Sequence, residues 1–290
     1  MPLSMPRTKI LEPNTVNLTL AHSPDSDDAF MFYALATRKI PTGSLQFTHH
    51  LEDIETLNRK ARQGAYDITA ISFHAYAYLA DQYLLLASGA SFGDGYGPLI
   101  IGRARLGPKD LQGKRIAIPG QMTTACLVLR LYEPKAILIE VPFDQILQTV
   151  ASGEADAGVV IHEGQLTFGA HGLKKLADLG EWWKRETGLP LPLGGNAIRR
   201  SLPLEIQREV NKALKTSITF ALEHRQEALE YALEFARGLD PASGDQFVSM
   251  YVNHWTLDCG PVGRQAVQTL LDRAHTAGII PDRIQAEFEG

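Results

Sequence analysis

An imidazole stands directly after an apolar run in the middle of this 290-residue chain. The run Ala157–Ile161 predicts a buried strand, and His162 follows it at the carboxyl edge, where open α/β sheets bind their ligands. Because imidazole titrates near neutral pH, a histidine at this edge can accept and return a proton during catalysis. The alternative is a structural role, in which His162 only hydrogen-bonds the end of its own strand.

Residue spacing argues against a metal. Leu166 occupies the position where an H-E-x-x-H zinc motif needs its second histidine, and no other histidine of the nine is spaced for a metal. The two cysteines, Cys126 and Cys259, lie far apart and outside any C-x-x-C pattern, which excludes a disulfide scaffold and a structural zinc. We therefore expect no metal site.

A second candidate site lies in the segment Arg115–Ala125, which predicts a strand, a tight Pro-Gly turn and the start of a helix over 125–131. Thr123 and Thr124 fall at the N-terminus of that helix. Unpaired backbone N–H groups, the positive end of the helix dipole and two hydroxyls can meet there on a carboxylate or a phosphate. The alternative is that Thr123 merely caps the helix.

Three aspartates follow the first predicted strand and open the next helix: Asp25, Asp27 and Asp28. Aspartate is favourable at an N-cap and in a first helical turn, so capping accounts for at least one of them. Three acidic groups in four positions exceed that need. We therefore predict that Asp27 and Asp28 hydrogen-bond substrate hydroxyls, with an acidic metal site as the weaker alternative.

Two other segments resemble catalytic motifs only superficially. Ser72 closes the predicted strand Ile68–Ser72 but has no G-x-S-x-G around it, so we expect it to hydrogen-bond a ligand rather than to act as a nucleophile. The glycines of Gly93–Gly97 are followed by Pro98 and a strand-like run, whereas a dinucleotide loop requires a helix there. A dinucleotide site is excluded on this ground.

These residues need a scaffold that brings strand ends together. From Val16 to about Asn196, short apolar runs alternate with amphipathic stretches, as in the βα units of a mostly parallel sheet. From Leu202 onward, apolar residues recur every fourth position, which predicts a helical C-terminal third with breaks near Gly238–Pro241 and Gly260–Pro261. The predicted strands are Val16–Ala21, Leu45–His49, Ile68–Ser72, Leu99–Gly102, Arg115–Ile118, Ile137–Val141 and Ala157–Ile161.

One unit of the βα part occurs twice. In each copy an amphipathic helix ends at a glycine, Gly64 or Gly153, and an aspartate, Asp67 or Asp156, then opens a buried strand. The repeat indicates either two similar lobes or ordinary βα packing.

With two lobes, the chain must cross between them, and two stretches rich in glycine and proline suit such crossings. These stretches are 89–98 and 190–195. Two crossings divide the chain into a discontinuous larger lobe, 1–97 with 195–290, and an inserted smaller lobe, 98–194. The expected fold is thus α/β, two-lobed and periplasmic-binding-protein-like of type II, with a ligand cleft between the lobes.

Net charge and hydropathy narrow the classes of binding partner that the chain can have. The chain has 28 Lys and Arg against 33 Asp and Glu, a net charge of −5, so its charge does not favour nucleic acid or an anionic membrane surface. No apolar stretch reaches the ~18 residues of a membrane span, and the N-terminus lacks the apolar core of a signal peptide. We expect a cytoplasmic protein with a small-molecule ligand.

The same segments resemble the 1,4-dihydroxy-6-naphthoate synthase family of the futalosine route to menaquinone, from about Leu18 to Ala277. The resemblance is specific because many matches occur in order. They are Ser23-Pro24 followed by Asp28-x-Phe30, Phe32–Leu35, Leu51–Asp53, Glu55–Asn58, Thr123-Thr124, Ile161–Glu163, Asp178–Trp183 and Thr187–Gly194.

This resemblance implies a cofactor-free lyase that converts cyclic dehypoxanthine futalosine to 1,4-dihydroxy-6-naphthoate. Its substrate would be a carboxylated bicyclic small molecule. In the family, a histidine matching His162 is the proposed proton acceptor. The family positions that line the substrate site match Ala70, Ile71, Ser72, Thr123 and Thr124.

The chain departs from the family pattern at two places. Ala70 stands where members can carry a lysine, and Asp25–Asp27 replace a less acidic stretch of the Cys-Pro-Asn type. We therefore expect a more negative cleft. The chorismate dehydratase of the same pathway and a non-catalytic solute-binding protein for a small carboxylated ligand are the two alternative functions.

Overall fold

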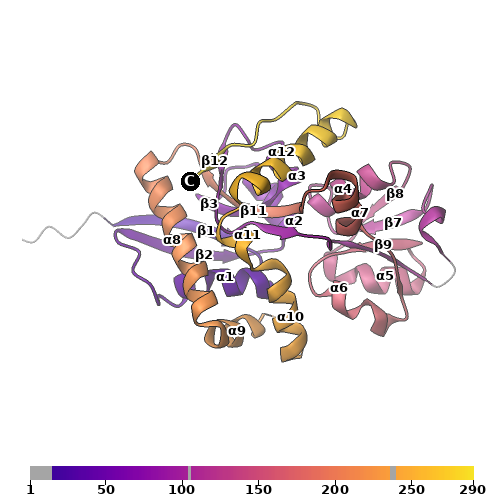
Figure 1. Cartoon of the computed structure of the whole chain (residues 1–290), viewed down its shortest axis with the longest axis horizontal. Helices are drawn as coiled ribbons and strands as arrows, with labels where there is room; N and C mark the ends of the chain where they lie inside the picture. Colours follow the sequence, from indigo (N-terminus) through magenta and orange to yellow (C-terminus); the bar gives the residue numbers. More distant parts are fainter. Residues whose placement is uncertain (1–14, 104–105, 236–239) are drawn as a thin grey trace, which may run out of the picture.

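The computed structural model describes residues 15–103, 106–235 and 240–290. Within these residues a seven-stranded and a five-stranded sheet occupy different halves of the molecule (Figure 1). The larger sheet contains β1 Val16–His22, β2 Leu45–Leu51, β3 Ile68–Ser72, β4 Tyr83–Leu86, β5 Ser91–Gly93, β11 Leu191–Arg199 and β12 Phe288–Glu289. The smaller sheet contains β6 Leu99–Gly102, β7 Arg115–Ile118, β8 Ile137–Glu140, β9 Ala157–Val160 and β10 Lys174–Asp178.

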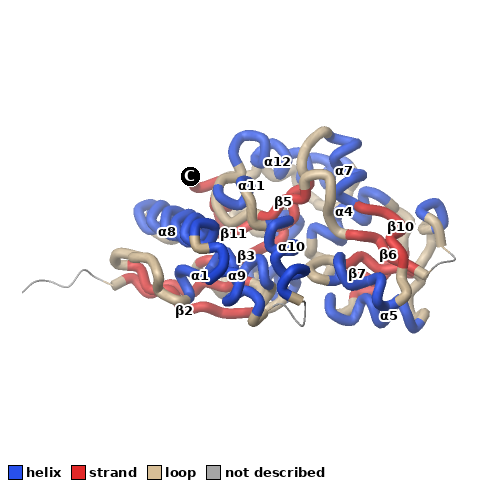
Figure 2. The backbone as a smooth tube through the Cα atoms, turned by 60° about the horizontal axis from the view of Figure 1, so that its bottom comes forward, coloured by secondary structure: helices blue, strands red, loops and turns tan. Residues whose placement is uncertain are grey.

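Helices pack around both sheets (Figure 2). They are α1 Ser26–Ala36, α2 Ile54–Ala61, α3 Phe73–Tyr76, α4 Thr124–Tyr132, α5 Ile146–Ser152, α6 Gly164–Thr167, α7 Leu179–Thr187, α8 Leu204–Glu223, α9 Arg225–Leu233, α10 Pro241–Tyr251, α11 His254–Leu257 and α12 Gly260–Thr276. Single 3₁₀ turns occur at Pro108–Asp110, Phe143–Gln145 and Phe168–His171. The prediction of a helical C-terminal third is confirmed. Residues 238–239 of the predicted break before Pro241 lie outside the described part of the chain.

All seven predicted strands are present, and no end differs from its prediction by more than two residues. The strands that the sequence did not reveal are β4, β5, β10, β11 and β12. Among these, β11 reads as a linker because Pro192, Gly194 and Gly195 interrupt it. Pairing with strands on both sides nevertheless keeps it extended, which shows tertiary contacts overriding local propensity.

Each sheet is mixed rather than mostly parallel, which corrects the expectation from the βα pattern. Strands β1, β2 and β3 pair in parallel, as do β7, β8 and β9. In contrast, β6 runs antiparallel to β9 and β10, and β11 runs antiparallel to β3, β4 and β5. Both exceptions are the first strands after the chain passes from one sheet to the other, so they do not follow the usual right-handed βαβ path.

The repeated unit has the same backbone form in both halves. Helix α2 leads to Gly64 at φ 62°, and helix α5 leads to Gly153 at φ 90°. Both angles lie in the left-handed region, which glycine adopts without the steric penalty of a Cβ atom. Each glycine turns the chain from a helix into a fully buried strand, β3 or β9.

The aspartates of the repeat also have matching roles. The Oδ2 atom of Asp67 accepts a hydrogen bond from the backbone N–H of Thr19 at 2.9 Å. The Oδ2 atom of Asp156 accepts one from the N–H of Arg115, also at 2.9 Å. Each carboxylate thus ties the start of one central strand to its parallel neighbour. The carboxyl ends of β3 and β9 therefore occupy equivalent positions in the two sheets.

Helix α1 is apolar on most of its surface because other elements enclose it. Its residues Phe30, Met31 and Phe32 are at most 1% exposed. They belong to a core cluster with Val210, Leu214 and Ile218 of α8, which lies alongside α1 in Figure 2. This packing fixes α1 and, with it, the three aspartates at its start: Asp25 is the N-cap residue, and Asp27 and Asp28 lie in the first turn.

The backbone approaches itself very closely at the crossing from β5 to β6. A Cβ atom at Gly180, in the first turn of α7, would lie 1.9 Å from the carbonyl oxygen of Tyr96 and 2.5 Å from the nitrogen of Gly97. Both contacts are with backbone, so neither can be relieved by a side-chain rotation. Glycine is required here to let α7 pack against the crossing.

We expect Gly180→Ala to lower the free energy of unfolding by about 3 kcal/mol, since overpacking against backbone must shift the crossing. That loss corresponds to a fall in Tm of roughly 5–10 °C. Gly169→Ala is the matched control, because a Cβ there meets nothing within 4 Å. Equal melting temperatures for the two variants, measured by calorimetry, would show that the crossing is not tightly packed.

The described residues include no helix that is both long and apolar enough to span a bilayer.

Cys126 and Cys259 are both free and buried, in line with the prediction from their spacing that they form no disulfide scaffold.

Candidate active site

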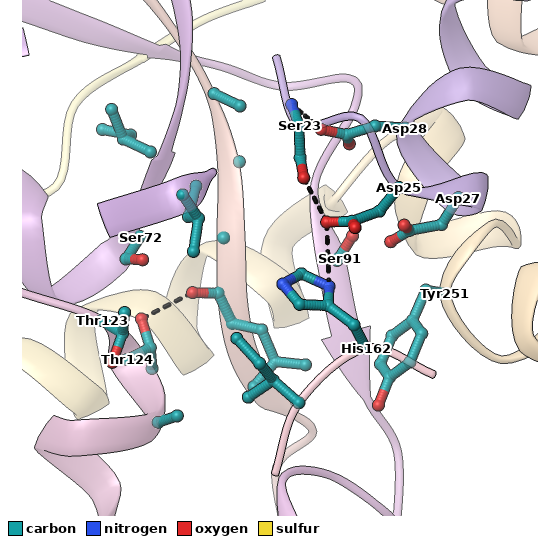
Figure 3. A pocket seen from close by; sticks show the side chains of 18 of the residues that line it. Ser23, Asp25, Asp27, Asp28, Ser72, Ser91, Thr123, Thr124, His162 and Tyr251 are labelled. Atoms are coloured by element: carbon teal, nitrogen blue, oxygen red, sulfur yellow. Dashed lines mark hydrogen bonds and ion pairs between the residues drawn. The ribbon is translucent and has the colours of Figure 1, made fainter. Parts of the chain in front are cut away.

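One pocket contains all of the residues that the sequence singled out for chemistry. It lies between the two sheets and encloses about 770 Å³, counting the part open to solvent. Figure 3 shows its walls, which come from both halves of the molecule. The predicted residues that line it are Asp27, Asp28, Ala70, Ile71, Ser72, Thr123, Thr124 and His162.

His162 follows β9 and projects into this pocket with an unusual backbone conformation. Its φ of 53° lies in the left-handed region, which costs a non-glycine residue about 1–3 kcal/mol. The imidazole Nδ1 atom lies 3.1 Å from Oδ2 of Asp25, and the ring meets Phe143 edge-on with centroids 5.1 Å apart. Figure 3 shows the other ring nitrogen turned toward the side of the pocket that holds Thr123 and Thr124. Backbone strain of this kind is typical of functional residues.

The N-terminus of α4 forms the opposite wall. Thr123 is the N-cap residue, and its hydroxyl accepts from the N–H of Cys126 at 3.2 Å and donates to the carbonyl of Gly120 at 2.8 Å. The Thr124 hydroxyl donates to the carbonyl of Leu193 at 2.5 Å. Both hydroxyl protons are therefore already engaged, which corrects the expectation that two hydroxyls converge on the ligand.

The backbone donors of α4 remain available. Within the described residues, the N–H groups of Thr124 and Ala125 have no protein acceptor. Both residues line the pocket. These two N–H groups and the positive end of the helix dipole make this wall suited to a carboxylate.

Ser72 ends β3, at the position that corresponds to the end of β9 in the other sheet. Its backbone N–H donates to Oδ1 of Asn58 at 2.9 Å, and its hydroxyl oxygen accepts from Nδ2 of Asn58 at 3.0 Å. Among the described residues the Ser72 hydroxyl donates to no acceptor, so it can donate a hydrogen bond to a ligand. Ala70 and Ile71 supply the apolar wall beside it.

The aspartates crowd at the other end of the pocket. Burial, followed by the charges of Asp28, Asp25 and Glu163, raises the pKa of Asp27 well above its usual range. Burial also raises the pKa of Asp28 to about 7, despite a hydrogen bond of 2.7 Å from the N–H of Ser23. This end of the pocket therefore disfavours an anion, whereas the α4 end favours one.

The raised pKa of Asp28 makes the stability of the fold depend on pH. Between the ordinary value near 3.8 and about 7, the folded protein holds a proton on Asp28 that the unfolded chain has released. Folding stability attributable to this group therefore falls as the pH rises through that range.

We expect Asp28→Asn to reduce the fall in Tm between pH 5 and pH 8, because its amide cannot ionise. The matched control is Asp81→Asn, which changes an exposed aspartate outside the pocket. Thermal unfolding at four pH values gives the slope of Tm against pH for each variant. If this slope is the same in Asp28→Asn and in the unmodified chain, Asp28 does not hold the extra proton in the folded protein.

Several lining residues had no signal in the sequence. Tyr251, from the end of α10, donates to Oε1 of Gln165 at 2.9 Å. Asn196, in β11, donates from Nδ2 to the carbonyl of Gly89 at 2.9 Å. Their residue types and spacing match no motif, and only the return of the C-terminal helices and of β11 brings them to the pocket.

Within the described residues, no three His, Cys, Asp or Glu side chains are grouped so that they could hold a metal ion.

The family model for menaquinone biosynthesis matches residues 18–276. The chain belongs to this family. Two relatives are both named 1,4-dihydroxy-6-naphthoate synthase. The one from Thermus thermophilus is 41% identical over 262 residues, covering 90% of this chain and 95% of the relative. The one from Streptomyces coelicolor is 36% identical over 270 residues, covering 91% and 95%.

Two solved structures are similar to this chain in fold. The crystal structure of protein AF1704 from Archaeoglobus fulgidus has a TM-score of 0.88 at 48% identity, covering 91% of this chain and 98% of that one. The alkanesulfonate-binding protein SsuA from Xanthomonas axonopodis has a TM-score of 0.70 at 15% identity, covering 95% and 97%. The second similarity concerns the fold alone. It confirms the predicted periplasmic-binding-protein-like architecture.

Proposed function

We propose that this chain is a 1,4-dihydroxy-6-naphthoate synthase that releases its product from cyclic dehypoxanthine futalosine as a cofactor-independent lyase. The observation that carries the proposal is the placement of His162 and the α4 N-terminus on facing walls of one pocket. The names of the two relatives support the reaction, and their role in biosynthesis supports a cytoplasmic location.

Charge determines how the substrate lies in the pocket. Its carboxylate accepts hydrogen bonds from the N–H groups of Thr124 and Ala125, where the helix dipole is favourable. The acidic cluster at the opposite end repels the same group. The uncharged, sugar-derived end of the substrate is therefore directed toward His162, with its hydroxyls near Asp27 and Asp28.

His162 then acts as the general base. Its free ring nitrogen accepts a proton from the sugar-derived part of the substrate, and the electron pair left behind drives bond cleavage toward the aromatic product. The Ser72 hydroxyl donates a hydrogen bond to the bicyclic part of the substrate. Ala70 and Ile71 pack against the apolar face of the same bicyclic part.

We also propose that residues 1–97 with 195–290 form the larger lobe and residues 98–194 the smaller lobe; residues 1–14, 104–105 and 236–239 of these ranges lie outside the described part of the chain. Support comes from strands β6–β10, all of which lie between Leu99 and Asp178 and make up the smaller sheet. The second boundary falls inside β11, which pairs with the larger sheet from Leu191 onward.

The proposal is tested by incubating the purified protein with cyclic dehypoxanthine futalosine, or with chorismate, and identifying products by mass spectrometry. We expect 1,4-dihydroxy-6-naphthoate from the first substrate, no dehydrated product from the second, and no loss of turnover with EDTA. Dehydration of chorismate would favour the dehydratase alternative. Binding of the naphthoate without any turnover would favour a solute-binding protein.

A further inference from the structure

A carboxylate from the opposite half of the molecule contacts His162. Asp25 follows β1 of the larger sheet, whereas His162 follows β9 of the smaller sheet, and their Oδ2 and Nδ1 atoms lie 3.1 Å apart. The aspartate side chain is 1% exposed and the imidazole 17%. The two groups form a largely buried, charge-assisted contact across the pocket.

Helix capping does not explain the direction of this carboxylate. Asp25 is the N-cap residue of α1, yet its side chain accepts no capping hydrogen bond. Asp53 and Asp178, the N-cap residues of α2 and α7, both accept helix N–H groups in the ordinary way. Instead, the Ser23 hydroxyl donates to the same Oδ2 atom that faces the imidazole. The serine thus holds the carboxylate in place for the histidine (Figure 3).

We propose that Asp25 is a positioning residue that orients His162 and sets its tautomer, an inference that rests on the proposed role of His162 as the base. By accepting the Nδ1 proton, Asp25 leaves the lone pair on Nε2, which faces the pocket. During the reaction a C–H or O–H bond of the substrate breaks, its electron pair stays on the substrate, and the proton forms an N–H bond at Nε2. The carboxylate then stabilises the imidazolium that results.

The contact between Asp25 and His162 joins the half that contains the larger sheet to the half that contains the smaller sheet. Two neighbours of His162 also meet the larger half: the Ser26 hydroxyl donates to Glu163 at 3.3 Å, and the Tyr251 hydroxyl donates to Gln165 at 2.9 Å. Residues 162–165 are thus held at three points by the opposite wall. Of these three contacts, only the one from Asp25 reaches the imidazole itself.

The test compares Asp25→Asn with Ser26→Ala by steady-state kinetics on cyclic dehypoxanthine futalosine. We expect Asp25→Asn to lower kcat about 100-fold, with KM within about 3-fold, because it removes the charge that stabilises the imidazolium. Ser26→Ala removes a neighbouring contact between the halves without touching the imidazole, and should stay within about 3-fold of the unmodified chain. Equal losses in both variants would mean that the loop is merely loosened, which overturns the proposal.

Two further readouts separate positioning from a structural role. Burial raises the pKa of Asp27 and Asp28, and the Asp25 charge adds to both shifts, so Asp25→Asn removes a negative charge beside them and should leave Tm unchanged or higher. A clear fall in Tm would indicate a structural residue. In the His162→Asn background, Asp25→Asn should change kcat less than about 3-fold, since a group acting through His162 has nothing left to orient.

The outcomes also distinguish this inference from the proposed function. If His162→Asn retains full turnover, both the base and its positioning residue are wrong. If His162→Asn is inactive while Asp25→Asn is fully active, only the role of Asp25 is refuted and the proposed reaction stands.

Discussion

Replacing His162 by asparagine is expected to lower kcat by about 10² to 10⁴-fold, the usual contribution of a positioned general base. The fold should survive, because asparagine adopts the left-handed conformation more readily than most residues, and His162 has a φ of 53°. The variant should also still bind the naphthoate product, since the carboxylate is held on the opposite wall. Kinetics, thermal unfolding and calorimetric binding measure the three effects separately.

His171→Asn is the matched control, because it makes the same chemical change at an exposed histidine outside the pocket. It should be as active as the unmodified chain. Turnover within a few-fold of normal in His162→Asn would remove this residue from the mechanism.

Replacing Thr124 by proline is expected to raise KM about 10-fold or more, relative to Thr124→Ala, while kcat changes little. Proline at this first helical position removes one backbone N–H and preserves the helix. Thr123 has φ −72° and ψ 148°, the extended conformation that a following proline requires. A hydrogen bond to a charged group is worth about 1.5–3 kcal/mol, which corresponds to a factor of roughly 10 to 100 in affinity.

The alanine variant is the necessary reference, because both substitutions remove the hydroxyl that donates to Leu193. The difference between them therefore isolates the N–H group. The carboxylate is bound equally in the ground state and the transition state, so its loss affects KM rather than kcat. Equal KM values in the proline and alanine variants would show that the substrate carboxylate binds elsewhere.

The sequence predicted the βα portion of the fold well because its strands are continuous apolar runs bounded by glycine and aspartate. Gly64 with Asp67, and Gly153 with Asp156, have the same conformations and contacts in both copies. The antiparallel strands β6 and β11 could not be predicted in this way. Their direction follows from the path between sheets, and this path leaves no local pattern in the residues.

The positions of the candidate residues were predictable where a side chain lies at a strand end or a helix start, as at His162, Ser72 and Thr124, which all line the pocket. Sequence reasoning was wrong about the threonine hydroxyls, because their acceptors, Gly120 and Leu193, are backbone carbonyls that only the folded chain brings near. It expected at least one of the three aspartates to cap the helix, but it did not foresee the contact between Asp25 and His162.

The most direct test of the account is a crystal structure with 1,4-dihydroxy-6-naphthoate bound, because the central claim is that His162 and the α4 N-terminus hold opposite ends of one molecule. We predict the carboxylate at the N–H groups of Thr124 and Ala125, with the hydroxylated ring directed toward Nε2 of His162. A carboxylate bound at the His162 end of the pocket, or a naphthoate bound only outside it, would contradict the account.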